Sequence, residues 1–264
     1  MPQADHRFTN RTIVVTGAAS GIGASTARLF AAEGATVYCA DIDQAGCLRT
    51  AERIHGPAGR EFAVPLDVAV EAQWEAGLGR VAEASGHLDV LVNSAGISCG
   101  APVSEMTLAE WRRGFAVNVD GVFLGTKHAV RAMTPRGGTI INVSSASGIR
   151  PAVGASVYST SKAAVGMFTR AVAKECRSLR LPIRVNAVAP AGVKTPMWMT
   201  MPFFQELVAQ RGSEEKAFEA LAEQNAGTRF AEPEAVASAI LYLASDAAAM
   251  ITGVELVIDD GYVL

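Results

Sequence analysis

The sequence predicts an α/β protein with one doubly wound domain, and two features of the chain lead to this prediction. Short apolar runs rich in β-branched residues alternate along the chain with longer stretches of helical pattern. Such runs are typical of parallel strands that helices cover on both faces. No Gly/Ser-rich linker, repeat or low-complexity tract interrupts the alternation, so we expect a single domain over residues 1–264.

Length and composition agree with a large globular domain. The chain has 264 residues, of which 50% are hydrophobic, and a net charge of −3, so it can bury a sizeable core and has no basic surface for nucleic acid. No apolar run approaches the ~20 residues that span a bilayer, and the N-terminus lacks the apolar core of a signal peptide. The four cysteines lack CxxC spacing, which favours reduced thiols in a cytoplasmic protein. The four histidines form no ligand cluster, so we expect no metal site.

The first strand and helix enclose a glycine-rich turn. Residues 12–16 (TIVVT) form a buried strand pattern, residues 17–23 (GAASGIG) follow, and residues 24–33 have a helical pattern. Glycines allow a pyrophosphate to approach the backbone, and the N-terminus of the helix faces it with free N–H groups. An ordinary tight turn is the alternative, but the strand before and the helix after favour a dinucleotide site of the Rossmann type.

A carboxylate ends the second predicted strand, residues 35–40. Asp41 lies about twenty positions beyond the glycines, where an acidic residue accepts hydrogen bonds from the adenosine ribose hydroxyls. The same charge repels a 2′-phosphate, and the glycine turn contains no Arg or Lys to bind one, so we expect NAD as the cofactor. The alternative is that Asp41 only begins a solvated turn.

Two further predicted strands deliver small or polar residues to the same edge of the sheet. After a helix over residues 44–54, a strand over residues 61–66 ends at Asp67 and Val68, and after a helix over 71–84 a strand over 88–92 ends at residues 93–96 (NSAG). Small residues suit close approach of a cofactor. A capping box formed by Thr107 and Glu110 opens a helix that reaches about Met133 and contains Asn118.

A strand over residues 138–143 precedes Ser145, and a helix over about 156–179 carries Tyr158 and Lys162. Residues i and i+4 lie on one face of a helix, so the phenol and the ammonium should be neighbours. A nearby ammonium favours the anionic phenol and lowers its pKa, which makes tyrosine usable as an acid and base near neutral pH. The YxxxK pattern is weak alone, because such pairs are common on solvated helices.

The composition changes after a sixth strand over residues 183–188. Residues 195–204 (TPMWMTMPFF) place large, soft side chains between prolines, too irregular for a core strand. We expect a substrate lid over about residues 196–229. A helix over residues 233–245 and a strand over 254–258 complete the domain.

These motifs, in this order, resemble those of the classical short-chain dehydrogenases/reductases. The matches are residues 16–23 (TGAASGIG), 67–68, 93–96, Asn118, Ser145, Tyr158-x-x-x-Lys162 and 186–190 (NAVAP), and they cover nearly the whole chain. The resemblance implies a seven-stranded parallel sheet in the order 3-2-1-4-5-6-7. It also implies a homotetramer or homodimer built through the helices that carry Asn118 and Tyr158.

The chain departs from the family pattern at two positions. Ser94 stands where the family has asparagine, and Ala191 stands where glycine is customary after the sixth strand. The second change places a Cβ near the expected nicotinamide. Val193 and Thr195 keep the positions that contact the carboxamide in this family.

The resemblance, together with the composition of the lid, assigns roles to individual residues. It implies catalytic roles for Asn118, Ser145, Tyr158 and Lys162, with Asn118 anchoring a water that relays protons to Lys162. The expected cofactor-binding residues are Gly17, Ser20, Gly21, Ile22, Gly23, Asp41, Ile42, Asp67, Val68, Asn93, Ala95, Gly96, Tyr158, Lys162, Pro190, Val193 and Thr195. The expected substrate-binding residues are Ser145, Tyr158, Met197, Trp198 and Phe204.

The function this implies is an NAD-dependent oxidoreductase that interconverts a hydrophobic secondary alcohol and its ketone. The lid loosely resembles those of hydroxysteroid and bulky secondary-alcohol dehydrogenases, so a cyclic, steroid-like or terpenoid-like substrate is expected. One alternative is a ketoacyl carrier-protein reductase, which would prefer NADPH, a basic surface and a shorter lid. The other is a non-catalytic dinucleotide-binding protein, which would usually lack the tyrosine or lysine.

Overall fold

A computed structural model of the protein describes residues 6–55, 62–134, 136–224 and 229–264. Its strands form one sheet in the order β3-β2-β1-β4-β5-β6-β7, and every pair of neighbours is parallel, as predicted. The strands are β1 (Thr12–Thr16), β2 (Thr36–Asp41), β3 (Ala63–Pro65), β4 (Val90–Asn93), β5 (Gly138–Val143), β6 (Ile183–Pro190) and β7 (Glu255–Ile258). The order reverses at β1, and ligands of such sheets bind at this reversal, beyond the carboxyl ends of the strands.

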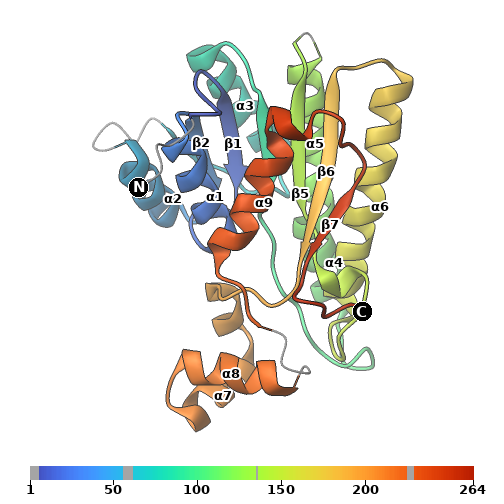
Figure 1. The fold of residues 1–264 in the computed structure, drawn as a ribbon. Coiled ribbons are helices and arrows are strands. Elements are labelled where there is room, and N and C mark those ends of the chain that lie inside the picture. The colour runs from blue at the N-terminus through green and yellow to red at the C-terminus, as the bar shows by residue number, and fades with distance from the viewer. Residues whose placement is uncertain (1–5, 56–61, 135, 225–228) are drawn as a thin grey trace.

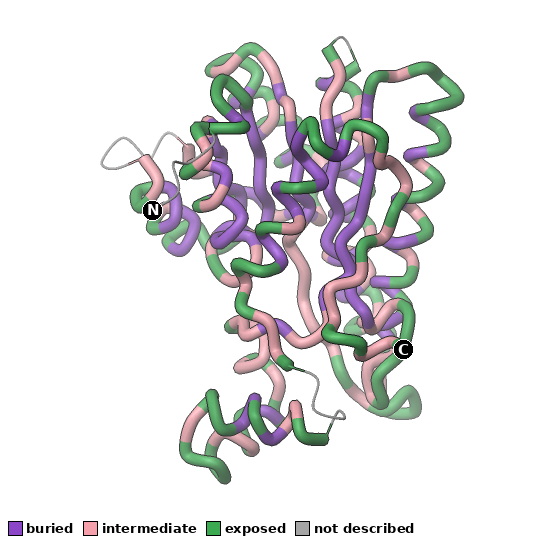
Figure 2. Tube along the Cα trace, in the orientation of Figure 1, coloured by how far each residue is buried: buried purple, intermediate pink, exposed green. Residues whose placement is uncertain are grey.

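Helices cover both faces of the sheet (Figure 1). One face carries α1 (Gly21–Ala32), α2 (Gln44–His55) and α9 (Pro233–Ala244), and the other carries α3 (Glu71–Ser85), α5 (Gly121–Met133) and α6 (Ser156–Ser178), with α4 (Leu108–Phe115) leading into α5. Successive strand residues face opposite layers, so Ile13 and Val15 join one hydrophobic core while Val14 joins the other. The strands are the most deeply buried part of the chain (Figure 2).

Two predicted elements differ from the observed ones. Of the strand predicted over residues 61–66, the structure has Ala63–Pro65, and residue 61 lies outside the described ranges. Pro65, at the end of this strand, has no N–H to donate to the ladder. The helix predicted from the capping box to Met133 is interrupted by a π-helical segment, Ala116–Asp120, between α4 and α5. The capping box itself is present.

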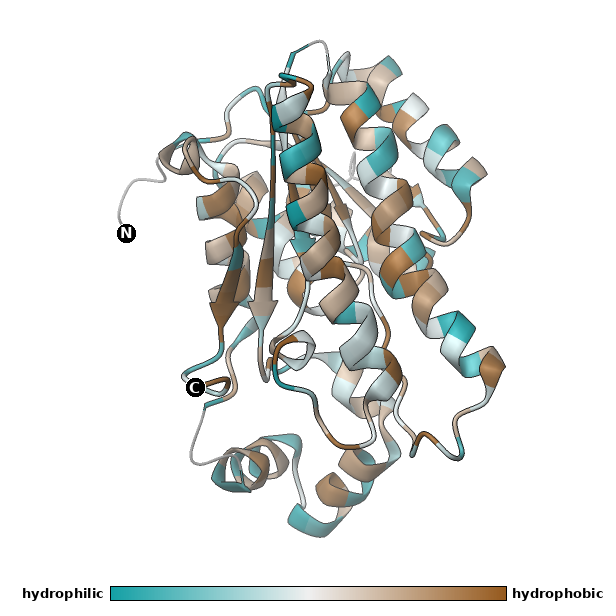
Figure 3. Cartoon of the chain, turned by 90° about the vertical axis from the view of Figure 1, so that its right-hand side faces the viewer, coloured by the Kyte–Doolittle hydropathy of each residue, from teal (hydrophilic) through white to brown (hydrophobic). Residues whose placement is uncertain are grey.

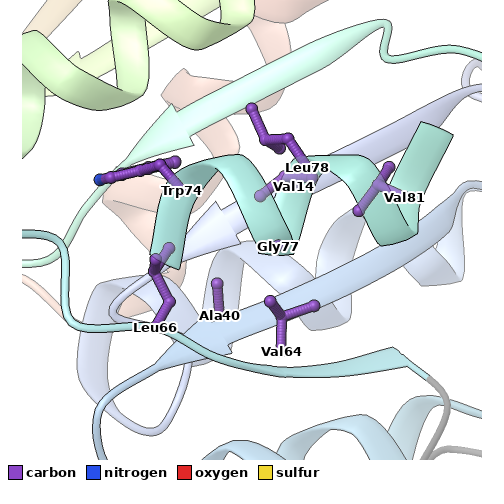
Figure 4. A pocket seen from close by; sticks show the side chains of 8 residues that line it. All are labelled: Val14, Ala40, Val64, Leu66, Trp74, Gly77, Leu78 and Val81. Carbon is purple, nitrogen blue, oxygen red and sulfur yellow. The ribbon is translucent and has the colours of Figure 1, made fainter. Parts of the chain in front are cut away.

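The core beneath α3 contains a small gap of about 10 Å³ (Figure 4). This volume is at the lower limit for one water molecule, and the lining is apolar, with Trp74 and Leu78 on α3 above Val14 and Val64 on the strands. A Cβ on Gly77 would lie 3.1 Å from Val64, so the glycine lets α3 approach the sheet. The gap is a packing feature of the core and not a binding site.

The expected lid, residues 196–229, bears helices, as the polar stretch after residue 204 indicates; residues 225–228 lie outside the described ranges. A 3-10 helix over Pro196–Thr200 is followed by α7 (Pro202–Arg211) and α8 (Glu214–Gln224). These helices enclose their own hydrophobic cluster, in which Phe204, Phe218 and Ala217 are buried. Figure 1 shows α7 and α8 standing beyond the end of the sheet. Within the described ranges, no helix has both the length and the apolar character needed to cross a membrane.

Candidate active site

The glycine turn between β1 and α1 lines a large cleft at the carboxyl end of the sheet. Gly17 has φ +68°, and a Cβ there would lie 2.9 Å from the backbone of Ala95; a Cβ on Gly23 would lie 2.2 Å from the carbonyl oxygen of Gly17. Side chains at these positions would disrupt the turn. The first turn of α1 contains no acidic residue, so its free N–H groups fit an anionic pyrophosphate.

The glycine turn is tied to the loop after β4 by Thr16. Its hydroxyl oxygen accepts hydrogen bonds from the amides of Ser94, at 3.0 Å, and Ala95, at 3.1 Å. Because the backbone of Ser94 makes this contact, serine in place of the family's asparagine leaves the turn intact. On the opposite side, Thr195 follows β6 and lies against Gly21, with its methyl carbon 3.2 Å from the position that a Cβ there would occupy.

Asp41 ends β2 beside the glycine turn. One carboxylate oxygen accepts a hydrogen bond from Ala19 N at 2.9 Å and the other from Asp43 N at 2.9 Å. Asp41 also lines the cleft, so it both shapes a turn and presents a negative charge to a ligand. The basic residues that line the cleft in the described parts of the chain are Arg113, Lys162 and Arg229, none of which belongs to the glycine turn or the end of β2.

Tyr158 and Lys162 lie together on α6, as the spacing predicted. Lys162 is 4% exposed, and its Nζ donates to the carbonyl of Val143 at 2.8 Å and lies 5.7 Å from the centroid of the Tyr158 ring. Burial lowers the pKa of Lys162 to about 8. Burial also raises the pKa of Tyr158, against the opposite effect of a hydrogen bond with Ser145. The expected lowering of the Tyr158 pKa by Lys162 is therefore not seen here.

Ser145 follows β5 and begins a short 3-10 helix, Ala146–Gly148. Its Oγ accepts a hydrogen bond from Ser147 N at 3.1 Å and donates to the carbonyl of Pro190 at 3.3 Å. With its hydrogen bond to Tyr158, the hydroxyl connects the ends of β5 and β6 with α6. The predicted Ser145, Tyr158 and Lys162 thus meet in one place.

Asn118 occupies the π-helical segment and is 1% exposed. Its side chain accepts from Ile97 N at 2.9 Å and donates to Ile97 O at 3.0 Å and to Ser161 Oγ at 3.1 Å. The Ser161 hydroxyl in turn donates to the carbonyl of Tyr158 at 2.7 Å. Asn118 therefore fixes the loop after β4 against α6, and π segments are frequent at functional sites. It does not line the cleft, so its proton-relay role stays a prediction.

The cleft has a volume of about 1230 Å³ and collects most of the predicted binding residues. Those that line it are Gly17, Ser20, Gly21, Ile22, Gly23, Asp41, Ile42, Asp67, Val68, Ala95, Gly96, Ser145, Tyr158, Lys162, Pro190, Val193, Thr195, Met197 and Trp198. A volume of this order accommodates a dinucleotide together with a small substrate.

Two predicted ligand contacts are corrected by the structure. Asn93 is buried and donates to Asn142 Oδ1 at 2.9 Å and Thr126 Oγ1 at 3.3 Å, so it supports the sheet and does not reach the cleft. Phe204 is fully buried in the cluster that α7 and α8 enclose, whereas its neighbour Phe203 lines the cleft and is 51% exposed. The orientation of α7 about its axis therefore turns Phe203 toward the cleft, where Phe204 was predicted, and buries Phe204.

The Cβ of Ala191 causes no backbone strain. Among the described residues, the non-glycine residues with positive φ are His6, Asn10, Arg180 and Asp260, so Ala191 lies outside the left-handed region. Glycine is needed at the next position, because a Cβ on Gly192 would lie 2.6 Å from the ring of Phe230.

The substrate end of the cleft includes residues that the sequence analysis did not identify. They come from the loops after β4 and β5, from the start of the segment over residues 196–229 and from the turn after β7, and include Ile97, Cys99, Met106, Val153, Met201, Phe203 and Tyr262. Their only common sequence signal is that they follow the carboxyl ends of strands.

One possible metal-ligand group is present in the described parts of the chain. Glu71, Glu75 and His128 lie close together on α3 and α5, outside the cleft. The ammonium of Lys127 already pairs with Glu71 at 2.5 Å, so this group carries no argument for a metal site.

Comparisons with known proteins agree with this geometry. A family model described as enoyl-(acyl carrier protein) reductase matches residues 17–263. The chain is 37% identical to cyclopentanol dehydrogenase of Comamonas sp. (strain NCIMB 9872), covering 97% of this chain and 98% of that protein. It is 43% identical to cis-4-hydroxycyclohexanecarboxylate dehydrogenase of Sinomonas cyclohexanicum, covering 97% of each.

A solved structure gives the same result for the fold. The 3-ketoacyl-(acyl-carrier-protein) reductase of Brucella melitensis, complexed with NADH, superposes with a TM-score of 0.83 at 30% identity, covering 97% of this chain and 99% of that one. Fold, catalytic constellation and relatives together place the chain in the classical short-chain dehydrogenase/reductase family of oxidoreductases.

Proposed function

We propose that the protein is an NAD-dependent oxidoreductase that interconverts a hydrophobic, cyclic secondary alcohol and its ketone. The observation that supports it most is the meeting of Ser145, Tyr158 and Lys162 in a cleft that has the glycine turn at one end and apolar lid residues at the other. The relatives named above are dehydrogenases of cyclopentanol and of a hydroxycyclohexane carboxylate, which supports a ring-containing alcohol.

The residues at the glycine end fit NAD. The turn and the first amides of α1 would hold the pyrophosphate, and Asp41 would accept hydrogen bonds from the adenosine ribose. Lys162 would bind the second ribose, while Val193 and Thr195 would contact the carboxamide. When bound, the nicotinamide supplies the acceptor or donor of the hydride. The protein contributes orientation, exclusion of water and proton transfer.

Proton transfer is assigned to Tyr158. In alcohol oxidation its deprotonated phenol removes the hydroxyl proton, and in ketone reduction its protonated form returns one. Ser145, which already bonds to Tyr158, would donate a hydrogen bond to the reacting oxygen. Asn118 would act as a positioning residue and anchor a proton-relaying water near Lys162.

A ketoacyl carrier-protein reductase is the second candidate, because the Brucella relative carries that name. Cofactor choice alone does not separate the two functions, since that relative is complexed with NADH. The apolar lid favours the free cyclic alcohol. The deciding experiment supplies the purified protein with NAD and cyclic secondary alcohols, and separately with NADH and a β-ketoacyl thioester. Turnover of the thioester alone would exclude the proposed alcohol substrate, and turnover of neither would favour a non-catalytic binding protein.

We propose that the segment over residues 196–229 is the substrate lid of a single Rossmann domain. Met197, Met201 and Phe203 line the cleft, while Phe204 and Phe218 pack inside the lid at a ring separation of 4.8 Å. Trp198 belongs to both sets, since it lines the cleft and donates through Nε1 to Val193 O at 2.8 Å. Methionines suit a wall that adapts to the shape of the substrate.

Truncation of the lid residues that face the cleft should alter size selection. We expect Met197→Ala and Phe203→Ala to weaken transition-state binding of bulky cyclic alcohols by about 1–3 kcal/mol each, with a smaller effect on cyclohexanol. The measurement is kcat/KM over a series of alcohols of increasing size. Met250→Ala is the matched control, because Met250 is 96% exposed and outside the cleft. Equal losses for all alcohols would contradict a role in size selection.

We also propose a homotetramer or homodimer through α5 and α6. Figure 3 views the side of the molecule on which α6 lies and shows hydrophobic segments on its helices. Phe123 on α5 is 46% exposed and Met167 on α6 is 61% exposed, and Phe123 contacts Phe168 with 6.3 Å between ring centroids. Adjacent exposed apolar side chains of this kind mark interaction surfaces. The four cysteines are free thiols, which supports a cytoplasmic enzyme.

A charged side chain placed on the exposed apolar surface of α5 and α6 should dissociate the proposed oligomer. Met167→Glu is expected to shift the mass measured by light scattering toward the monomer, because the charge would be buried in the interface. Met250→Glu places the same charge on an exposed methionine elsewhere and should leave the mass unchanged. A monomeric wild-type protein would exclude the proposed interface.

A further inference from the structure

The C-terminal turn, residues 259–264, follows β7 and reaches the substrate end of the cleft. Tyr262 in this turn lines the cleft, although no sequence motif indicated a role for it. Figure 1 shows the C-terminus at the same end of the sheet as the lid. The turn is hydrogen-bonded to two segments that are remote from it in sequence, one through Arg150 and the other through Arg229.

The turn has a defined conformation. The carboxylate of Asp259 accepts hydrogen bonds from Gly261 N at 3.0 Å and Val263 N at 2.8 Å, and Tyr262 N donates to the carbonyl of Asp259 at 3.0 Å. Asp260 has φ +49° and Gly261 has φ +85°. Aspartate is one of the few residues besides glycine that adopt the left-handed region readily, so the turn is accommodated at Asp260.

The side chain of Asp260 binds the end of the lid segment. Its two oxygens pair with the guanidinium of Arg229, with Nη2–Oδ1 at 3.0 Å and Nε–Oδ2 at 3.2 Å, and Arg229 N also donates to Oδ2 at 3.0 Å. Hydrogen bonds from Arg229 lower the pKa of Asp260 to about 2. The pair is therefore charged at all physiological pH values and joins the C-terminal turn to the lid.

A second arginine holds Tyr262 against the catalytic loop. Arg150 lies in the loop between Ser145 and Tyr158, donates through Nη1 to the carbonyl of Tyr262 at 2.5 Å, and has its guanidinium 5.0 Å from the centroid of the Tyr262 ring. This geometry is a cation–π contact. No hydrogen bond to the Tyr262 hydroxyl is found among the residues that the structure describes, so the phenol is free to bond to a ligand.

We propose that Tyr262 is a specificity-determining residue of this cleft, an inference that rests on the proposed alcohol dehydrogenase function. Its ring would pack against the ring of a cyclic alcohol, and its hydroxyl would bond to a polar substituent remote from the reacting hydroxyl. Arg150, Arg229 and Asp260 are positioning residues that fix the tyrosine between the catalytic loop and the lid.

The test compares two substitutions of Tyr262 on a pair of substrates, cyclohexanol and a cyclohexanol with a 4-carboxylate. Tyr262→Phe should raise KM about tenfold for the substituted alcohol only, since it removes one hydrogen bond. Tyr262→Ala should raise the KM for the substituted alcohol about tenfold or more. The KM for cyclohexanol should rise by a smaller factor. The affinity for NAD should stay within about twofold of wild type, and thermal unfolding checks the fold of each variant.

The positioning role has its own matched pair. Asp260→Asn keeps the shape and tolerates the left-handed conformation but loses the charge, and should shift substituent discrimination in the same direction as Tyr262→Ala. Asp246→Asn makes the same change at a carboxylate whose side chain is 98% exposed and should have no effect. If the Tyr262→Ala enzyme is active and keeps the wild-type ratio of KM values for the two alcohols, the role of Tyr262 is overturned and the proposed function is not. A wild-type protein inactive on every cyclic alcohol would overturn the proposed function and this inference with it.

Discussion

Replacing Tyr158 with phenylalanine is expected to reduce kcat by about 10²–10⁴-fold, the usual contribution of general acid–base catalysis. The ring keeps its packing on α6, so the affinity for NAD should remain nearly unchanged. Lys162→Ala should reduce both turnover and NAD affinity, because the proposed role of Lys162 includes the nicotinamide ribose. Steady-state kinetics and a direct binding measurement with NADH separate the two outcomes.

The control for this experiment is Tyr242→Phe. Tyr242 lies on α9, is 43% exposed and does not line the cleft, so the same loss of a hydroxyl should leave kcat unchanged. A Tyr158→Phe enzyme that kept more than about a tenth of the wild-type kcat would show that another group transfers the proton.

The pH dependence follows from the same residue. Burial raises the pKa of Tyr158, so the phenol is mostly protonated at neutral pH and its basic form increases as the pH rises. Oxidation of the alcohol needs the basic form, so kcat/KM for oxidation should rise with pH on the alkaline side. Reduction of the ketone needs the protonated form and should fall there. Tyr158→Phe should abolish both slopes, which distinguishes Tyr158 from other titrating groups.

The wild-type enzyme should prefer NAD over NADP by about 10²-fold in kcat/KM, the second largest effect expected. Asp41 would accept a hydrogen bond from the adenosine ribose and repel a 2′-phosphate, and charged hydrogen bonds contribute about 1.5–3 kcal/mol. Asp41→Ser should weaken NAD binding and so erode the preference. Tight binding of NADP should need an added arginine, since no basic side chain lines this part of the cleft in the described chain.

Asp41 also bonds to Ala19 N in the glycine turn, so a structural effect must be separated from a recognition effect. Asp41→Asn retains an acceptor for that amide but removes the charge. It should lose most of the discrimination against NADP, and its loss of NAD affinity should be smaller than that of Asp41→Ser. Asp246→Asn, at a carboxylate that is 98% exposed and does not line the cleft, is the matched control and should leave the cofactor preference unchanged. Equal kcat/KM for the two cofactors in the wild type would contradict the assignment.

Much of the fold could be predicted from local patterns. The strand order and the glycine turn depend on short, strongly apolar runs and on residues whose backbone geometry is restrictive. The π-helical segment could not be predicted, because residues 108–133 have an ordinary helical pattern. The interruption occurs where the Asn118 side chain bonds to Ile97 and Ser161, and these are long-range contacts that no local pattern contains.

Some of the predicted binding residues could likewise be identified from local sequence, and others could not. Those defined by backbone position, such as Gly17 and Thr195, line the cleft as expected. The choice between Phe203 and Phe204 depends on the phase of α7, which the prolines in the sequence did not determine. Tyr262 was missed because Arg150, which bonds to it, and Arg229, which pairs with the neighbouring Asp260, are far from the C-terminal turn in sequence.

The hydrophobic cluster within the lid has a consequence for divergence within the family. Its buried members, Phe204, Ala217 and Phe218, form a group separate from the two cores of the sheet. Substitutions that reshape the lid can therefore accumulate without compensating changes around the strands that carry the cofactor site. If the segment is the lid we propose, its exchange would change the substrate range without altering the residues proposed for hydride and proton transfer.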